Sequence, residues 1–73
     1  MDEQNEEFWR DLFCRWVLEG RPRVIQQDHL VILGGAICER VANDDTPLPL
    51  QVLLPVDLPV GMTFCQAARL VVD

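Results

Sequence analysis

A long apolar stripe near the start of the chain limits its possible folds more than any other feature. Between residues 5 and 19, large apolar side chains recur every three or four positions, at Phe8, Trp9, Leu12, Phe13, Trp16 and Val17. This spacing predicts an amphipathic helix over residues 5–19. Asn5 suits the N-cap, and Gly20 followed by Pro22 marks the end. Its aromatic face has to be covered by the rest of the chain or by a second chain.

The chain has only 73 residues from which to build that cover. A domain of this size buries roughly 60–65% of the surface that its unfolded form exposes. Hydrophobic residues make up 49% and charged residues 25%, a composition typical of folded domains. We therefore expect one small domain, residues 1–73, with the tryptophan face in its core. A monomer is favoured over a homodimer that would share this face.

The stretch after the first helix allows two interpretations. In the first, Leu30–Leu33 and Ala36–Val41 are strands of a hairpin, with Gly34 and Gly35 as its turn. In the second, Asp28 caps a helix whose apolar face contains Leu30, Leu33, Ile37 and Val41. Two adjacent glycines would destabilise that helix by roughly 2 kcal/mol relative to alanine. We therefore favour strands.

The proline-containing segment that follows is the next most apolar part of the chain. Leu50–Leu54 is a candidate short strand. Pro55 and Pro59 lack an N–H group and exclude a continuous central strand over residues 53–60. We expect the apolar side chains of this stretch to cover the long helix: Leu53, Leu54, Val56, Leu58 and Val60.

A capping-box pattern marks the last element. Thr63 is followed three residues later by Gln66, which predicts a helix over residues 64–71. The expected fold class is therefore α+β: a long N-terminal amphipathic helix on a short, mostly antiparallel sheet, completed by a short C-terminal helix.

The charge balance indicates which partners suit the chain. Twelve acidic residues against six arginines give a net charge of −6. Such a domain is repelled by nucleic-acid backbones and anionic membranes, so we expect neither direct nucleic-acid binding nor membrane binding. A basic protein surface is the better expected partner.

Two acidic clusters are the first candidate binding residues. Glu3, Glu6 and Glu7 lie near the N-terminus, and Asp44 and Asp45 lie in a predicted loop. They could steer a basic partner over a distance of roughly 8–10 Å. The more frequent role of such runs is a solvated surface that also caps a helix.

Arg21 and Arg23 form the only basic cluster and complete the candidate partner-binding set. They could contact a phosphate or carboxylate group. Alternatively, they simply complement the negative end of the first helix.

We expect no catalytic, cofactor or metal site. Cys14, Cys38 and Cys65 are widely spaced and lack the close pairs of zinc sites, and His29 is the only histidine. A nucleophilic thiol would also need a base and a substrate cleft. The odd number of cysteines, without a secretory segment, indicates reduced thiols in a cytoplasm.

As a whole, the chain resembles small phage-encoded proteins that take over host machinery. The resemblance rests on the opening "MDEQNEEFWRDLFCRWVLEG" and on the size and acidic character of the whole chain. Within that group it is most similar to the small regulators of bacterial RNA polymerase, of the Xanthomonas phage type. This resemblance implies a non-enzymatic inhibitor of host transcription initiation that also promotes terminator read-through. No motif carries it, so it assigns no residue.

Two other functions fit the same properties. One is a phage counter-defence inhibitor of a host nuclease complex, which would share the acidity. The other is a small structural or antitoxin-like dimer that uses the tryptophan face.

Overall fold

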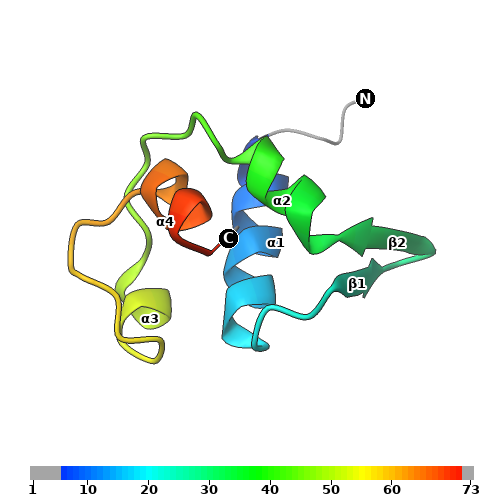
Figure 1. The fold of residues 1–73 in the computed structure, drawn as a ribbon, viewed down its shortest axis with the longest axis horizontal. Helices are drawn as coiled ribbons and strands as arrows, with labels where there is room; N and C mark the ends of the chain where they lie inside the picture. Colours follow the sequence, from blue (N-terminus) through cyan, green and yellow to red (C-terminus); the bar gives the residue numbers. More distant parts are fainter. Residues whose placement is uncertain (1–5, 72–73) are drawn as a thin grey trace.

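The computed structural model describes residues 6–71 as an α+β fold of short elements around one core (Figure 1). Along the chain these are α1 (Glu6–Leu18), β1 (Val24–Gln27), β2 (Leu30–Leu33), α2 (Gly34–Arg40), α3 (Leu50–Leu53) and α4 (Phe64–Val71). The predicted fold class is confirmed, with a long N-terminal helix, an antiparallel sheet and a short C-terminal helix. Asn5, the predicted N-cap, lies outside the described residues.

The helix α1 ends where the glycine predicted it would. The backbone N–H of Gly20 donates to the carbonyl of Val17, and that of Arg21 donates to the carbonyl of Trp16, at 3.1 and 3.0 Å. These two bonds make a Schellman cap, which needs a left-handed residue after the helix, and Gly20 has φ +96°. The chain then turns sharply into the hairpin.

The apolar face of α1 forms the centre of the core. Phe13 and Trp16 are buried, and Phe13 contacts Phe64 of α4 at 5.8 Å between ring centroids. The indole N–H of Trp16 donates to the carbonyl of Pro22 at 2.6 Å. Trp9 is half-buried at the core's edge, with the Arg40 guanidinium 4.8 Å from its ring centroid. The core interpretation of the tryptophans therefore holds fully for Trp16 and partly for Trp9.

The predicted hairpin turn at the two glycines is wrong. The observed hairpin pairs β1 with β2, with Val24 opposite Leu33 and Gln27 opposite Leu30. Its turn is therefore Asp28-His29, and Asp28 has φ +57°, as the first central residue of such turns requires. Of the two strands predicted for this hairpin, only Leu30–Leu33 is a strand in the structure.

The second predicted strand, Ala36–Val41, is instead mostly helical, within α2. Gly34, Ile37, Cys38 and Val41 are buried, and their spacing of three, four and seven residues is that of one helical face. A strand would have sent Ile37 and Cys38 to opposite sides. Gly34 lies against Trp16, where an added Cβ would be 2.7 Å from a ring carbon. This glycine is therefore required for close packing, not for a turn.

The predicted strand at Leu50–Leu54 is also wrong, because Leu50–Leu53 forms the single helical turn α3. Val52 and Leu53 are both buried in the core, which consecutive residues of a strand facing one core cannot achieve. Pro55 has no N–H to continue the helix. The turn ends at Asp57, with φ +60°, and the N–H of Leu58 donates to the carbonyl of Leu53 at 2.9 Å.

The proline-containing segment covers the core only in part. Leu53 is buried, and Val56 and Leu58 are partly buried against the core. Leu54 and Val60 are exposed, contrary to the expectation that they cover α1. Both lie in turns whose backbone direction is set by Asp57 and Gly61, which has φ +91°.

The predicted C-terminal helix is confirmed, with its capping box formed on both sides. The Thr63 N–H donates to Gln66 Oε1 at 3.1 Å, and the Gln66 N–H donates to Thr63 Oγ1 at 3.3 Å. Phe64, Ala67 and Ala68 then face the core. In residues 6–71, no helix combines the length and the apolar character that crossing a bilayer would require.

Candidate protein-binding surfaces

The two predicted acidic clusters are joined by one arginine. Arg10 Nε donates to Asp44 Oδ2 at 2.6 Å and Arg10 Nη2 to Asp44 Oδ1 at 3.3 Å, a two-point contact. The same Nη2 lies 3.2 Å from Glu6 Oε1. Since Arg10 and Glu6 are four residues apart on α1, this guanidinium connects the first turn of the helix to the loop around Asp44.

Asp44 is a structural carboxylate in this arrangement. Its side chain is only 12% exposed, and its Oδ1 also accepts the N–H of Thr46 at 3.0 Å. The hydrogen bond from Arg10 lowers the pKa of Asp44 to about 2, so this carboxylate is charged at neutral pH and already paired. It is therefore less available to a partner than the sequence indicated.

The remaining candidate acids differ in their surroundings. Glu6 and Glu7 are exposed in the first turn of α1, where negative charge stabilises the helix dipole. Asp45 is exposed, and its Oδ1 lies 3.6 Å from the Cys65 thiol that donates to it. Glu3 lies outside the described residues. Glu7 and Asp45 form no ion pair within residues 6–71 and stay available to a cation.

Arg21 and Arg23 are exposed on either side of Pro22, between α1 and β1. Neither makes an ion pair with an acidic side chain of the described part. Arg21 has φ +58° because it directly follows the left-handed Gly20 in the cap of α1. The backbone therefore fixes the position of its Cα, while its side chain remains free to meet a partner.

The sequence did not predict the main exposed apolar surface, which lies on the hairpin. Val24, Val31 and Leu33 are 45%, 66% and 59% exposed. The register puts Val24 opposite Leu33 and leaves Val31 two residues away on the same side, so all three share one face of the ribbon. We call these three residues the hairpin face. The apolar, β-branched residues on both sides of Asp28-His29 were the sequence signal for this hairpin. The prediction instead placed the turn at Gly34 and Gly35.

The other side of the hairpin is attached to the body. Ile25 is buried in the core, and Ile32 packs against it. Gln27 Oε1 accepts a hydrogen bond from Arg15 Nη2 of α1 at 2.6 Å. In Figure 1 the ribbon extends from the body. One face therefore anchors the hairpin, and the hairpin face points to solvent.

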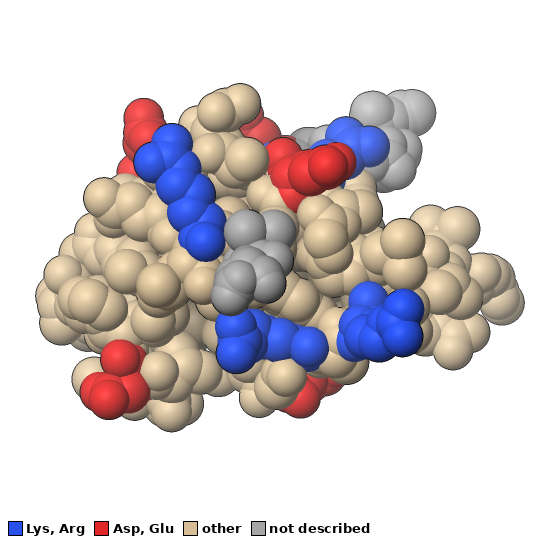
Figure 2. Space-filling model, in the orientation of Figure 1, with Lys and Arg blue, Asp and Glu red and all other residues tan. Residues whose placement is uncertain are grey.

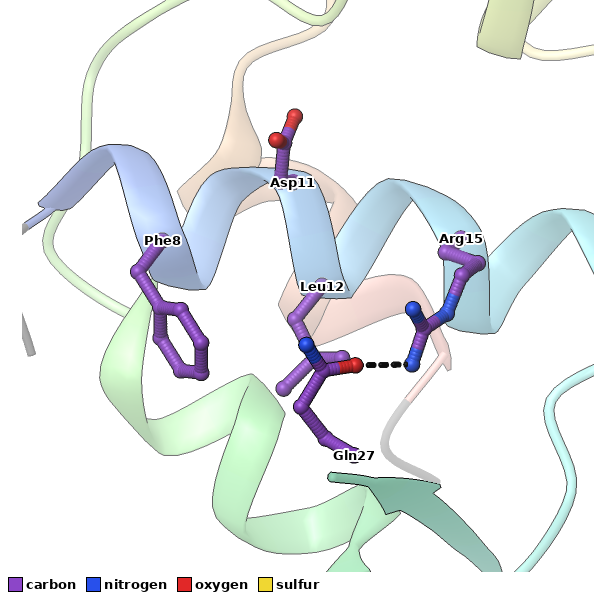
Figure 3. Close-up of a pocket in the computed structure, with 5 residues that line it drawn as sticks. All are labelled: Phe8, Asp11, Leu12, Arg15 and Gln27. Atoms are coloured by element: carbon purple, nitrogen blue, oxygen red, sulfur yellow. Dashed lines mark hydrogen bonds between the residues drawn. The ribbon is translucent and has the colours of Figure 1, made fainter.

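A hollow of about 330 Å³ lies where the hairpin meets α1 (Figure 3). Phe8 and Leu12 supply its apolar walls, and the hydrogen bond between Arg15 and Gln27 closes one side. Figure 3 shows the Asp11 carboxylate pointing away from the other labelled side chains. The hollow therefore presents both apolar surface, from Phe8 and Leu12, and polar groups, from Arg15 and Gln27.

A larger groove of about 520 Å³ lies between the end of α1, residues 56–58 and the end of α4. Its lining is aliphatic apart from Arg21 and the backbone of Gly20, and consists of Val17, Val56, Leu58, Leu70 and Val71. A groove of this composition can hold an apolar side chain and place a charged group next to a guanidinium.

The cysteines and the histidine do not converge. Among the described residues, no three metal-binding side chains come together. His29 is exposed in the hairpin turn. Burial raises the pKa of Cys14 to about 11, with a smaller contribution from Asp11, and burial also raises the pKa of Cys38. Both thiols are therefore protonated at neutral pH.

In comparisons with known proteins, the chain matches no protein-family model, no curated protein and no solved structure.

Proposed function

We propose that this protein is a non-enzymatic protein-binding module that acts in the cytoplasm of a bacterial host. In this proposal it binds the host RNA polymerase, inhibits transcription initiation and promotes terminator read-through. The observation that carries the binding role is the hairpin face. The choice of polymerase rests on the resemblance of the chain to phage-encoded polymerase regulators.

The hairpin face has the properties of a binding surface. Three aliphatic side chains lie side by side on a two-stranded ribbon, and each exposes about half of its surface or more. Burying the part of one such side chain that is still exposed contributes about 1–2 kcal/mol, since complete burial contributes about 1.5–3 kcal/mol and these residues are already partly covered. A few well-buried side chains supply most of the affinity in a typical protein interface. The hairpin face can therefore supply a substantial part of a specific contact.

The acidic residues add steering to this contact. Glu7 and Asp45 form no ion pair with another described side chain, and the chain carries a net charge of −6. Exposed charges of one sign raise the rate of association with an oppositely charged surface, and they add less to the affinity itself. The proposal therefore assigns affinity to the hairpin face and association rate to the acids.

A pull-down from bacterial lysate tests this function. The tagged protein should recover the RNA polymerase subunits, and Val31→Lys should recover much less of them. The matched control is Val60→Lys, because Val60 is 78% exposed in a different part of the chain and the charge change is identical. Recovery of a nuclease complex in place of polymerase would contradict the proposal and support the counter-defence alternative.

A further inference from the structure

We propose that the groove beside Arg21 binds an acidic–aliphatic segment of a partner protein, in which an aliphatic side chain is followed or preceded by a carboxylate. This deepens the proposed function, and it rests on that function only in taking the ligand to be a protein. The site lies apart from the acidic clusters, and its chemistry is opposite to theirs.

The shape and lining of the groove define the first half of the ligand. Its volume of about 520 Å³ is enough for one or two aliphatic side chains. Five aliphatic residues from three parts of the chain line it, and Leu70 exposes 56% of its surface at the edge. The end of α1, residues 56–58 and the end of α4 each contribute side chains to this one groove. An aliphatic side chain placed there would contact all three.

Arg21 defines the second half of the ligand. It is the only charged residue in the lining, and it makes no ion pair with an acid of the described part. Glu19, which directly follows α1, has its Oε2 3.9 Å from Arg15 Nε. The last turn of α1 offers few acceptors, because the carbonyls of Trp16 and Val17 already accept the N–H groups of Arg21 and Gly20. The guanidinium is therefore available to a carboxylate from outside.

The lining of the groove carries one positive charge and no negative one, although the chain as a whole is acidic. The face in Figure 2 has arginine side chains across its central part and most of its acidic side chains nearer its outline. Asp57 lies between two lining residues in the sequence but is not part of the lining. An aliphatic groove beside a guanidinium that has no ion pair within residues 6–71 selects a carboxylate-bearing peptide over a basic one, because charged groups determine which partner an apolar surface accepts.

The test uses the full chain and three labelled peptides that share a Leu-Val centre. The centre is flanked by aspartates in the first peptide, by serines in the second and by lysines in the third. At about 1 mM peptide, the aspartate peptide should bind most strongly and shift the methyl NMR signals of Leu58, Leu70 and Val71. Arg21→Glu should weaken its binding about tenfold and favour the lysine peptide.

Arg23→Glu is the matched control, because Arg23 is exposed two residues away, lies outside the groove and gives the same charge change. It should leave the peptide preference nearly unchanged. Equal loss in both variants, equal binding of the three peptides, or no shift in the groove would overturn the proposal. A homodimer that Arg21→Glu dissociates would also overturn it, since the occupant would then be a second copy. None of these results bears on polymerase recovery, so the two proposals fail separately.

Discussion

At position 34 a single methyl group would collide with the indole of Trp16. An added Cβ would come within 2.7–2.9 Å of three atoms of that ring, whereas a Cβ at Gly35 would meet nothing within 4 Å. The two neighbouring glycines are therefore a matched pair. One is needed for packing between α1 and α2, and the other is a weak point of the helix.

We predict that Gly34→Ala lowers the free energy of unfolding by about 1–3 kcal/mol, because overpacking forces Trp16 or α2 to move. Gly35→Ala should raise it by about 0.5–1 kcal/mol, because alanine favours the helix. Urea unfolding followed by circular dichroism measures both. Stabilisation by both substitutions would contradict the close contact.

At the same scale, Asp44 links stability to pH. Its pKa lies near 2 in the folded protein, below the ordinary value of 3.8. Stability from this group is therefore present above about pH 4 and is lost as the pH falls toward 2. Asp44→Asn should reduce the free energy of unfolding by about 1–2 kcal/mol at pH 7, since Arg10 loses its charged partner. The difference from wild type should shrink steadily between pH 5 and pH 2, and a constant difference would contradict the ion pair.

At the scale of elements, α4 depends on its cap. Thr63→Ala removes the acceptor for the Gln66 N–H and should lower the free energy of unfolding by about 1 kcal/mol. Thr63→Ser keeps a hydroxyl at this position and should retain most of the wild-type stability. Thermal unfolding of the two variants measures this. Equal stability of Thr63→Ala and wild type would mean that packing of Phe64 and the alanines alone holds α4.

The elements that could be predicted are those with local signals. The range of α1 was predictable from its apolar stripe, and that of α4 from its capping box. Both signals lie within or directly beside the helix that they predict. The elements that were mispredicted depend on distant contacts. Gly34 reads locally as a turn residue, and only the position of Trp16 shows why it starts a helix. At Leu50–Leu53 an apolar run shorter than two helical turns fits a strand and a helix equally well.

The candidate binding residues were predictable to a similar degree. Charge runs are visible in any sequence, so the acids and Arg21 were identified as candidates. The pairing of Arg10 with Asp44 spans 34 residues and could not be read from spacing. The hairpin face was missed because it depends on the register of β1 and β2, and a turn placed six residues too late puts different side chains on the same face.

At the scale of the whole molecule, the acids and the apolar hairpin face should affect binding in different ways. Replacing Glu6 and Glu7 together by lysine should slow association with RNA polymerase and flatten its salt dependence, because both side chains are exposed. The pair Glu19→Lys and Asp57→Lys gives the same charge change away from this end of α1, because both residues are exposed and neither lies near its first turn. Stopped-flow association at several salt concentrations compares them, and identical rates in the two variants would remove Glu6 and Glu7 from the mechanism.

The most direct test of the account is the affinity of the full chain for purified bacterial RNA polymerase, measured for wild type, Val31→Lys and Val60→Lys. Val31 and Val60 are both exposed, so neither substitution disturbs the core. We predict that wild type and Val60→Lys bind equally and that Val31→Lys binds at least about fivefold more weakly, since burying the exposed part of this aliphatic side chain contributes about 1 kcal/mol or more. Wild-type affinity in the Val31→Lys variant, or no binding of polymerase by the wild type, would contradict it.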